Sequence, residues 1–420
     1  MEVKTCSRVI RGGFGIFYDK PEGNIIFGQT GVVPFLKSVQ FNSGNLSNIT
    51  GGTGATPTIF GMSAVDPNFK NASSMQYSFG VQHELPYGVL MEINYVGNQG
   101  RHEVRQPNIN VPTFEVVNAA FAANPALTNV GQVVDNPIRP FVGYTDITQY
   151  RSDSNSNYNA LQVFATKRKG NLQTTVSYTW ARTLGDTGGI NDNPEPECAF
   201  SCVLPNGQVI PWQRFDYGPL SFHRQHVFVV TYNYEFPFFR SQQGPIGVLL
   251  GGWQVGGITR AQSGQPLTVT ATQAVGNQSF NRRVDIVPGV PLYSGFTCPQ
   301  ATKCWFNPGV VKDPISLQQI MNTPTFMTAN VTARTGPFNH VGNAPTGNIL
   351  GPGYLNFDFS IRKRFNLPRE GMNLVFQSDF FNAFNRANWL NPGTNAGGGL
   401  GIINSAATPR QLQFGLKFAF

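Results

Sequence analysis

The C-terminal stretch Arg410-Gln411-Leu412-Gln413-Phe414-Gly415-Leu416-Lys417-Phe418-Ala419-Phe420 decides the fold of this chain. Hydrophobic residues occupy every second position from Leu412 onward, and polar or small residues lie between them. Because side chains alternate between the two faces of a strand, this pattern predicts a strand with one apolar and one polar face. A strand of about 9–11 residues crosses a tilted bilayer. An edge strand of a soluble sandwich shows the same alternation, so the rest of the chain has to separate these two interpretations.

The composition favours one large all-β unit over several ordinary domains. Of 420 residues only 12% are charged, whereas 46 are Gly and 34 are Phe. The mean hydropathy is -0.18, and no apolar run reaches the roughly 20 residues of a spanning helix, which argues against a helical membrane protein. The net charge of +8 is scattered, with short basic runs only at 167–169 and 362–364, so nucleic acid is not an expected partner.

Further alternating segments precede the C-terminal stretch and are joined by connections of two kinds. Short turns are expected near Tyr87, Gly170, Phe239 and Pro368, and the intervening connections are long and rich in Gly, Asn and Ser. The longest expected loops cover 20–74, 97–157, 185–222 and 263–353, with a short helix at 116–123 and an extra strand at 267–272. The expected strands cover 8–18, 75–85, 89–95, 158–168, 172–182, 226–236, 249–262, 354–365, 372–380 and 410–420.

The strict alternation of long and short connections distinguishes a membrane barrel from a soluble sandwich. Outer-membrane barrels place short turns at the periplasmic rim and long loops outside, whereas a sandwich has no reason to segregate them. The sequence therefore predicts an all-β fold in the cell outer membrane. It is an antiparallel transmembrane β-barrel portion of about ten strands, with long outer loops and short periplasmic turns. The face carrying Phe357, Phe359 and Ile361 is expected to meet lipid, and the alternate face the lumen.

The cysteines form two close pairs in the expected outer loops, Cys198 with Cys202 and Cys298 with Cys304. Zinc sites use shorter Cys-x2-Cys spacing and often a nearby His, which both pairs lack. We therefore expect the disulfides Cys198–Cys202 and Cys298–Cys304, with Cys6 free. The run Asp153-Ser154-Asn155-Ser156-Asn157 lacks the Gly and the final Glu of a calcium loop. No metal or cofactor is expected.

Several stretches carry a family resemblance: RGGFGIFYD (11–19), NYNALQ (157–162), GGWQVGG (251–257), DFFNAFN (379–385) and FGLKFAF (414–420). They resemble the barrel of TonB-dependent outer-membrane receptors, specifically the Oar-like group abundant in acidobacteria. The terminal residues Phe414, Leu416, Phe418 and Phe420 resemble the C-terminal insertion signal of bacterial outer-membrane barrels. That resemblance implies recognition of this strand by the barrel-assembly machinery.

The resemblance also implies that residues 1–420 are a partial β-barrel domain. The complete barrel would have about 22 strands. The signal peptide, the carboxypeptidase-like domain and the plug are expected to be absent from this chain. Such receptors take up a large ligand with energy that TonB delivers through the plug. The implied partners are outer-membrane lipid, an unknown large ligand, and TonB acting through the missing N-terminal region. No ligand-binding residues carry over, because specificity lies in variable loops.

Two other functions share the predicted barrel. A surface adhesin would display the same loops without transport. A small rim protease would use Asp and His, for which the candidates are His223, His226, Asp216 and Asp186. No paired carboxylates at defined spacing support such chemistry, so no catalytic residues are expected and the chain is not expected to be an enzyme.

The expected lumenal face is unusually small and polar. Representative positions are Ser78, Gly80 and Gln82, followed by Gln173, Thr175 and Ser177. Such side chains cannot fill a narrow barrel, and they suit the wall of a wide barrel around a separate domain. The chain alone is therefore expected to form an open sheet with unpaired edges at 8–18 and 410–420, which favours aggregation.

Overall fold

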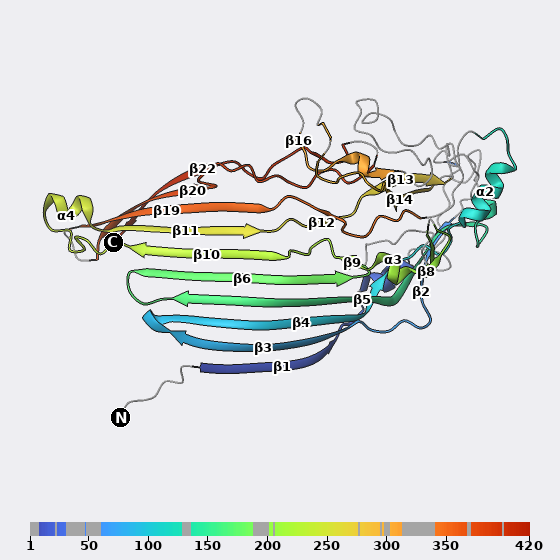
Figure 1. Cartoon of the computed structure of the whole chain (residues 1–420). Helices are drawn as coiled ribbons and strands as arrows, with labels where there is room; N and C mark the ends of the chain where they lie inside the picture. Colours follow the sequence, from blue (N-terminus) through green and yellow to red (C-terminus); the bar gives the residue numbers. More distant parts are fainter. Residues whose placement is uncertain are drawn as a thin grey trace.

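Ten long strands form one antiparallel sheet in the computed structural model of the chain (Figure 1). The sheet order is β1-β3-β4-β5-β6-β10-β11-β19-β20-β22, so each strand pairs with the next of this series along the chain. The structure describes residues 8–21, 23–30, 47, 60–127, 136–187, 201–204, 206–275, 278–294, 296–297, 303–312, 341–367, 371–396 and 399–420. The ten strands are β1 (Arg8–Tyr18), β3 (Ser73–Leu85), β4 (Val89–Arg105), β5 (Tyr144–Lys167), β6 (Leu172–Gly185), β10 (His226–Glu235), β11 (Trp253–Gln262), β19 (Tyr354–Asn366), β20 (Asn373–Phe381) and β22 (Gln411–Ala419).

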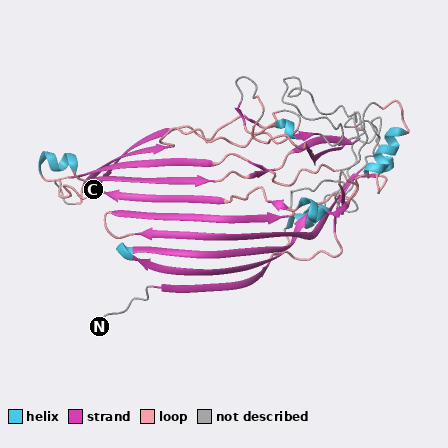
Figure 2. Cartoon of the chain, viewed as in Figure 1, coloured by secondary structure: helices cyan, strands magenta, loops and turns pink. Residues whose placement is uncertain are grey.

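Short turns join the strands at one end of the sheet, and long loops join them at the other (Figures 1 and 2). The C-terminus lies at the short-turn end, as the alternating connection lengths predict. The turns contain η1 (Pro86–Gly88) and α4 (Gly244–Leu250). The long loops carry α1 (Gly23–Thr30), β2 (Phe60–Val65), α2 (Phe114–Ala122), η3 (Asn136–Ile138), β7 (Ser201–Val203), β8 (Val209–Pro211), α3 (Trp212–Asp216), β9 (Gly218–Pro219), β12 (Pro266–Leu267), β13 (Thr270–Val275), β14 (Gln278–Arg283), β15 (Asp285–Ile286), β16 (Lys303–Cys304), η5 (Pro308–Val310), β17 (Val311–Lys312), β18 (Ile349–Leu350) and β21 (Ile402–Ile403).

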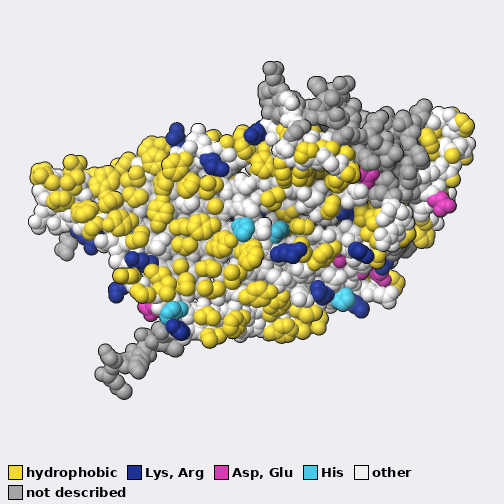
Figure 3. Space-filling model, in the orientation of Figure 1, with side chains coloured by type: hydrophobic (Ala, Val, Ile, Leu, Met, Phe, Trp, Pro, Cys, Tyr) yellow, Lys and Arg dark blue, Asp and Glu magenta, His cyan; other side chains and the backbone are white. Residues whose placement is uncertain are grey.

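The register aligns the apolar positions of neighbouring strands on a single face. Val81 lies opposite Ile93, and Phe79 lies opposite Tyr95. At the other edge of the sheet Phe414 and Leu416 are 64% and 69% exposed. Figure 3 shows hydrophobic side chains over most of this face. Exposed apolar surface of this extent is stable only against an apolar environment, which is what the lipid-facing side of a membrane sheet provides.

No helix among the described residues has the length and apolarity needed to cross a membrane.

Two strands are longer than the sequence predicts. The predicted loop at 97–157 contains the last part of β4 and the first part of β5, so the run 153–157 lies in a strand. The outer part of β5 pairs in parallel with β2, and β2 lies inside the segment 20–74 that was predicted to be a loop. The outer parts of β4 and β5 are mostly polar, with Ile147 and Tyr150 as buried exceptions in β5. Alternating hydrophobicity therefore ends before the strand does.

The two outermost strands each pair on one side only among the described residues. β1 pairs with β3, and β22 pairs with β20. Both edges thus present unpaired backbone groups to a further strand.

The buried apolar residues of the chain gather in the outer loops. One cluster includes Val269, Val284, Phe306 and Ile349, which are all fully buried. A second contains Cys202, Ile210, Trp212, Phe215 and Val341. The loops therefore fold into a body with its own core, which we call the outer cap and which comprises the described residues 201–222, 264–312, 341–351 and 388–408.

Candidate functional site

The polar face of the sheet is the first part of the candidate site. Its side chains bond to one another along and between strands rather than packing into a core. The Gln254 amide donates to Asn233 Oδ1 at 2.7 Å, and the Asn356 amide donates to Asp358 Oδ1 at 2.8 Å. Gln377 Nε2 donates to both Asp379 oxygens, at 2.7 and 2.9 Å. A face of this kind is suited to contact water, a ligand or another polar protein surface.

A shallow hollow lies on this face where β10, β11, β19 and β20 run side by side. Its volume is about 450 Å³, and it is lined by Asn233, Gln254, Gly256, Asp358, Arg362 and Asp379 among others. Gly256 has no side chain to fill the space between its neighbours, which leaves room for an incoming group. The hollow therefore offers amides, carboxylates and one guanidinium to whatever the barrel encloses.

A larger cavity of about 550 Å³ lies at the loop end of β1, β3, β4 and β5. Aromatic side chains line part of it, and Asn98 and Glu103 contribute polar groups; the aromatic residues are Phe17, Tyr18, Phe69 and Phe222. Ser156 Oγ donates to Glu103 Oε1 at 2.7 Å. An added Cβ at Gly100 would collide with the Glu103 carboxylate, so Gly100 makes room for it. The cavity combines apolar walls with hydrogen-bonding groups, as ligand pockets commonly do.

Burial sets the protonation of the carboxyl groups beside this cavity. Desolvation raises the pKa of Glu103, although the Ser156 hydroxyl opposes the shift, and the nearby Asp186 charge adds to it. Desolvation also raises the pKa of Asp186, against hydrogen bonds from Ser154 and the Asn155 amide. Both groups lie beyond the apolar band, where β4 and β5 have left the bilayer. Glu103, which lines the cavity, and the neighbouring Asp186 therefore keep their protons to higher pH than exposed carboxyl groups do.

Arg105 joins the outer cap to the sheet. Its side chain is fully buried, and its guanidinium donates to both Asp153 oxygens, at 2.7 and 3.0 Å. The same guanidinium lies 3.6 Å from the ring centre of Trp212 in the cap. Burial would raise the pKa of Asp153, but Arg105 and Arg151 outweigh it and hold that pKa below its ordinary value. Arg151 also pairs with Asp66 at 3.4 Å, which ties the segment after β2 to β5.

Arg283 makes an equivalent connection within the cap. It donates to Asp216 Oδ1 and to the Phe215 carbonyl, both at 2.8 Å, and lies 3.4 Å from the Phe215 ring centre. Arg105 and Arg283 thus hold α3 from two sides, one from the sheet and one from β14. A buried guanidinium that both pairs with a carboxylate and stacks on a ring fixes geometry more tightly than a lysine would.

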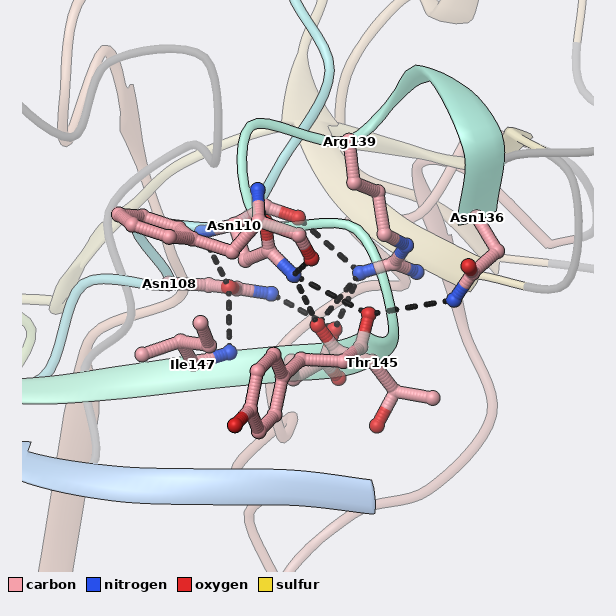
Figure 4. Close-up of polar contacts among 9 residues, drawn as sticks. Asn108, Asn110, Asn136, Arg139, Thr145 and Ile147 are labelled. Atoms are coloured by element: carbon pink, nitrogen blue, oxygen red, sulfur yellow. Dashed lines mark hydrogen bonds and ion pairs between the residues drawn. The ribbon is translucent and has the colours of Figure 1, made fainter. Parts of the chain in front are cut away.

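A third set of polar contacts orders the loop between β4 and β5 (Figure 4). The Asn110 amide donates to the carbonyls of Phe141, Tyr144 and Thr145 at 2.8–3.1 Å, and its oxygen accepts from the Phe141 amide at 2.7 Å. Arg139 donates to the Asn110 and Thr145 carbonyls at 3.0 and 2.8 Å. These bonds close the loop onto the start of β5.

The predicted cysteine sites lie in the outer loops. Cys202 and Cys304 are disulfide-bonded. Their predicted partners Cys198 and Cys298 lie outside the described residues, as does Cys6, so both pairings stay predictions. Among the residues that the structure describes, no group of three or more His, Cys, Asp or Glu side chains is placed to hold a metal ion.

The C-terminal signal residues Phe414, Leu416, Phe418 and Phe420 project from β22 and its end, and all are exposed. Aromatic contacts connect them: Phe376 stacks on Phe414 and Phe418 on Phe420, with ring centres 6.3 and 5.7 Å apart. The strand exists as predicted, and its role in insertion stays a prediction.

The residues considered for a rim protease have separate partners. His223 Nδ1 accepts from the Thr183 amide at 3.3 Å, and His226 Nδ1 lies 2.8 Å from the Tyr178 hydroxyl. Asp216 pairs with Arg283, and Asp186 accepts from Ser154. None of these contacts joins a histidine to a carboxylate, so they do not form the base–orienter pair of a hydrolase.

Sequence reasoning did not find Arg105, Trp212 or Arg283. Each lies in a region predicted as loop, and a single arginine or tryptophan in a polar stretch carries no periodic signal. Only the folded cap brings them together.

The comparisons with known proteins agree with this geometry. The outer membrane beta barrel domain family matches residues 4–413. No curated protein matches the sequence. The outer membrane transporter YddB from Escherichia coli has a similar structure, with a TM-score of 0.52 at 9% identity over 99% of this chain.

Two further solved structures are similar at lower scores. The ferric-catecholate import receptor Fiu from E. coli K12 covers 99% of this chain at 10% identity, with a TM-score of 0.40. The pyoverdine receptor FpvA from Pseudomonas aeruginosa PAO1 covers 98% at 10% identity, with a TM-score of 0.39. This chain spans 39% of the YddB structure and 34% of the other two.

The three proteins are described as a transporter and two receptors. The family match covers nearly the whole chain, and the YddB structure shares the fold. The chain therefore belongs to the outer membrane beta barrel domain family and is located in the outer membrane.

Proposed function

We propose that this chain forms part of the barrel wall of a TonB-dependent receptor of the Oar-like type, which takes up a large ligand across the outer membrane. The observation that carries the proposal is the two-sided character of the sheet. One face is apolar and exposed across ten strands. The other face carries hydrogen-bonded amides and carboxylates, several of which line a shallow hollow. A narrow closed barrel would have to fill such a face with side chains, whereas a wide barrel around a plug would not.

The open edges of β1 and β22 support the same proposal. We infer that further strands of the same polypeptide pair with both edges and complete a barrel of about 22 strands. A plug would then rest against the polar face, and TonB would act through that plug. The outer cap and the aromatic cavity would meet the ligand first, because both lie at the loop end of the strands.

The test uses the full receptor polypeptide in native outer membranes, with a photoactivatable amino acid at Ser360 on the polar face. We expect intramolecular crosslinks from Ser360 to a plug segment, identified by mass spectrometry. Phe357 is the matched control. It lies three residues before Ser360 on the same strand, with its side chain on the opposite, lipid-facing side, and it should give lipid adducts. Large steady ion conductance in planar bilayers, without a crosslink at Ser360, would indicate an open pore and contradict the proposal.

A further inference from the structure

The connection between β10 and β11 exposes an apolar surface that a periplasmic turn has no need of. Phe238, Ile246 and Leu249 are 61%, 65% and 68% exposed, and Phe239, Val248 and Leu250 are also exposed. We call these six side chains the α4 patch. The turns at Pro86–Gly88 and near Gly170 present no comparable cluster of exposed apolar side chains among the residues described there. Exposed apolar clusters of this kind mark a surface that meets an apolar environment or a partner.

The connection that carries the patch is held rigidly against the sheet. Lys363 is 3% exposed, and its ammonium donates to the carbonyls of Val248 and Leu249 at 2.6 and 3.2 Å and to that of Gly251. It therefore binds the carbonyl groups that the end of α4 leaves unpaired. The Trp253 indole N–H also donates to the Leu249 carbonyl at 2.9 Å.

Gln242 fixes the other side of the connection. Its amide donates to the Arg364 carbonyl at 2.7 Å, and its oxygen accepts from the Asn366 amide at 2.9 Å. Gly252 has a φ of +72°, and an added Cβ there would collide with Gln242 and with the Arg364 carbonyl. A side chain at Gly251 would collide with the Phe239 carbonyl. The polar groups of this connection thus face the sheet, and its apolar side chains are left pointing outward.

The patch continues the lipid-facing surface of the sheet. Figure 3 shows hydrophobic side chains over α4 that merge with those on the strands. Trp253 lies between the α4 patch and the apolar face of the sheet. The Lys363 ammonium lies 5.3 Å from the centre of its ring. Tryptophan side chains are enriched at the boundary between acyl chains and headgroups.

Exposed cations near this end of the sheet complement an anionic leaflet. Arg168 and Arg240 are exposed at the turns. Arg240 is positioned beside the patch by its bond to the Asn171 side chain. Basic side chains flanking an apolar surface favour anionic phospholipid.

We propose that the α4 patch inserts into the phospholipid of the periplasmic leaflet, so that this turn is a membrane-interface anchor rather than a segment in the periplasm. The proposal depends on the location in the outer membrane and not on the transport function. It commits to lipid as the occupant because the patch is continuous with the lipid-facing side of the sheet and is flanked by cations.

The experiment places a photoactivatable diazirine amino acid at Leu249 in the full polypeptide, in native outer membranes. The matched control carries the same group at Lys169, on the turn between β5 and β6. We expect phospholipid adducts at Leu249 to exceed those at Lys169 several-fold. Protein adducts at Leu249 would show that a partner or a second copy covers the patch and would overturn the proposal. A label at Leu249 that is quenched mainly by water, to the same extent as the label at Lys169, would also overturn the proposal.

A second measurement does not depend on the diazirine. The double variant I246S/L249S leaves every bond of Lys363 and Gln242 in place, because both of its positions have exposed side chains. We expect it to fold and to reach the outer membrane, and a lipid-depth probe at Arg240 should then report a shallower position than in the unchanged chain. An unchanged depth in the folded variant would contradict the anchor.

Discussion

The sheet and the outer cap keep their apolar residues in opposite places. In the sheet Phe79, Phe414 and Leu416 are more than half exposed. In the cap Val269, Val284 and Phe306 are fully buried. The two regions have similar residue types and different surroundings, since the sheet faces lipid and the cap faces water. The difference teaches that burial within this chain identifies the aqueous part of the molecule, whereas exposure of apolar residues identifies its membrane part.

Ion pairs follow the same division. The buried arginines Arg105, Arg139 and Arg283 all lie in the outer loops or at the outer strand ends. The lumenal face of the sheet carries polar side chains bonded to their immediate neighbours, such as Gln377 with Asp379. Stability of the cap therefore depends on a few buried polar contacts, and stability of the sheet depends on its backbone ladder and on lipid.

The largest effect is expected from removing the arginine that joins the two regions. Arg105→Ala leaves Asp153 without its bidentate partner and exposes one side of Trp212, and we expect a loss of about 4 kcal/mol in the free energy of cap opening. Hydrogen exchange of residues 201–216 measures it. Arg105→Lys keeps the charge but not the fork geometry and should show an intermediate loss. Exchange unchanged in both variants would show that the cap does not depend on this contact.

The next effect tests the membrane side of the comparison. Phe414→Arg puts a charge into the apolar band, and we expect a cost of roughly 2–4 kcal/mol in the free energy of folding into a bilayer. Gln413→Arg, one position away on the polar face, is the matched control and should cost much less. Equilibrium unfolding of the full polypeptide in vesicles measures both. Equal costs at the two positions would remove the lipid-facing assignment.

The predicted disulfides concern only the cap. Cys202→Ser opens the predicted bridge to Cys198 and should lower the stability of the loop body by on the order of 2 kcal/mol, because the closed loop is short. Limited proteolysis of the outer loops measures the change. Mass spectrometry of unreduced peptides should show Cys198–Cys202 and Cys298–Cys304, and free thiols at all four would disprove both pairings.

The smallest effect is a pH dependence at the junction of the two regions. The folded state raises the pKa of Glu103, mainly by burial, so it binds that proton more tightly than the unfolded state does. Between the ordinary and the raised pKa, stability of the outer end of β4 should therefore fall as pH rises. Hydrogen exchange across a pH series measures this slope, and Glu103→Gln should reduce it. The pKa of Asp153 is lowered in the folded state, so the stability that this group contributes should instead fall as the pH decreases below its ordinary pKa.

The strands inside the bilayer were the part of this fold that was readable from sequence. The alternation in Leu412–Phe420 and in Tyr77–Leu85 predicted strands with one apolar and one polar face, and the structure confirms the strands and their pairing. That the apolar face meets lipid stays a prediction. The outer ends of β4 and β5 were missed, because these parts of the strands are mostly polar. The helix α2 (Phe114–Ala122) was predicted nearly to its bounds, at 116–123.

The sequence by itself determined the all-β class, the separation of short turns from long loops, and the two faces of the sheet. These follow from local periodicity and connection length, which need no long-range contact. The tertiary structure decided which residues meet in the outer cap. Arg105 lies 107 positions before Trp212, and Arg283 lies 67 positions after Asp216, so no local pattern relates them. It also decided that Lys363 reaches back over 112 residues to the end of α4, where it leaves an apolar surface turned outward.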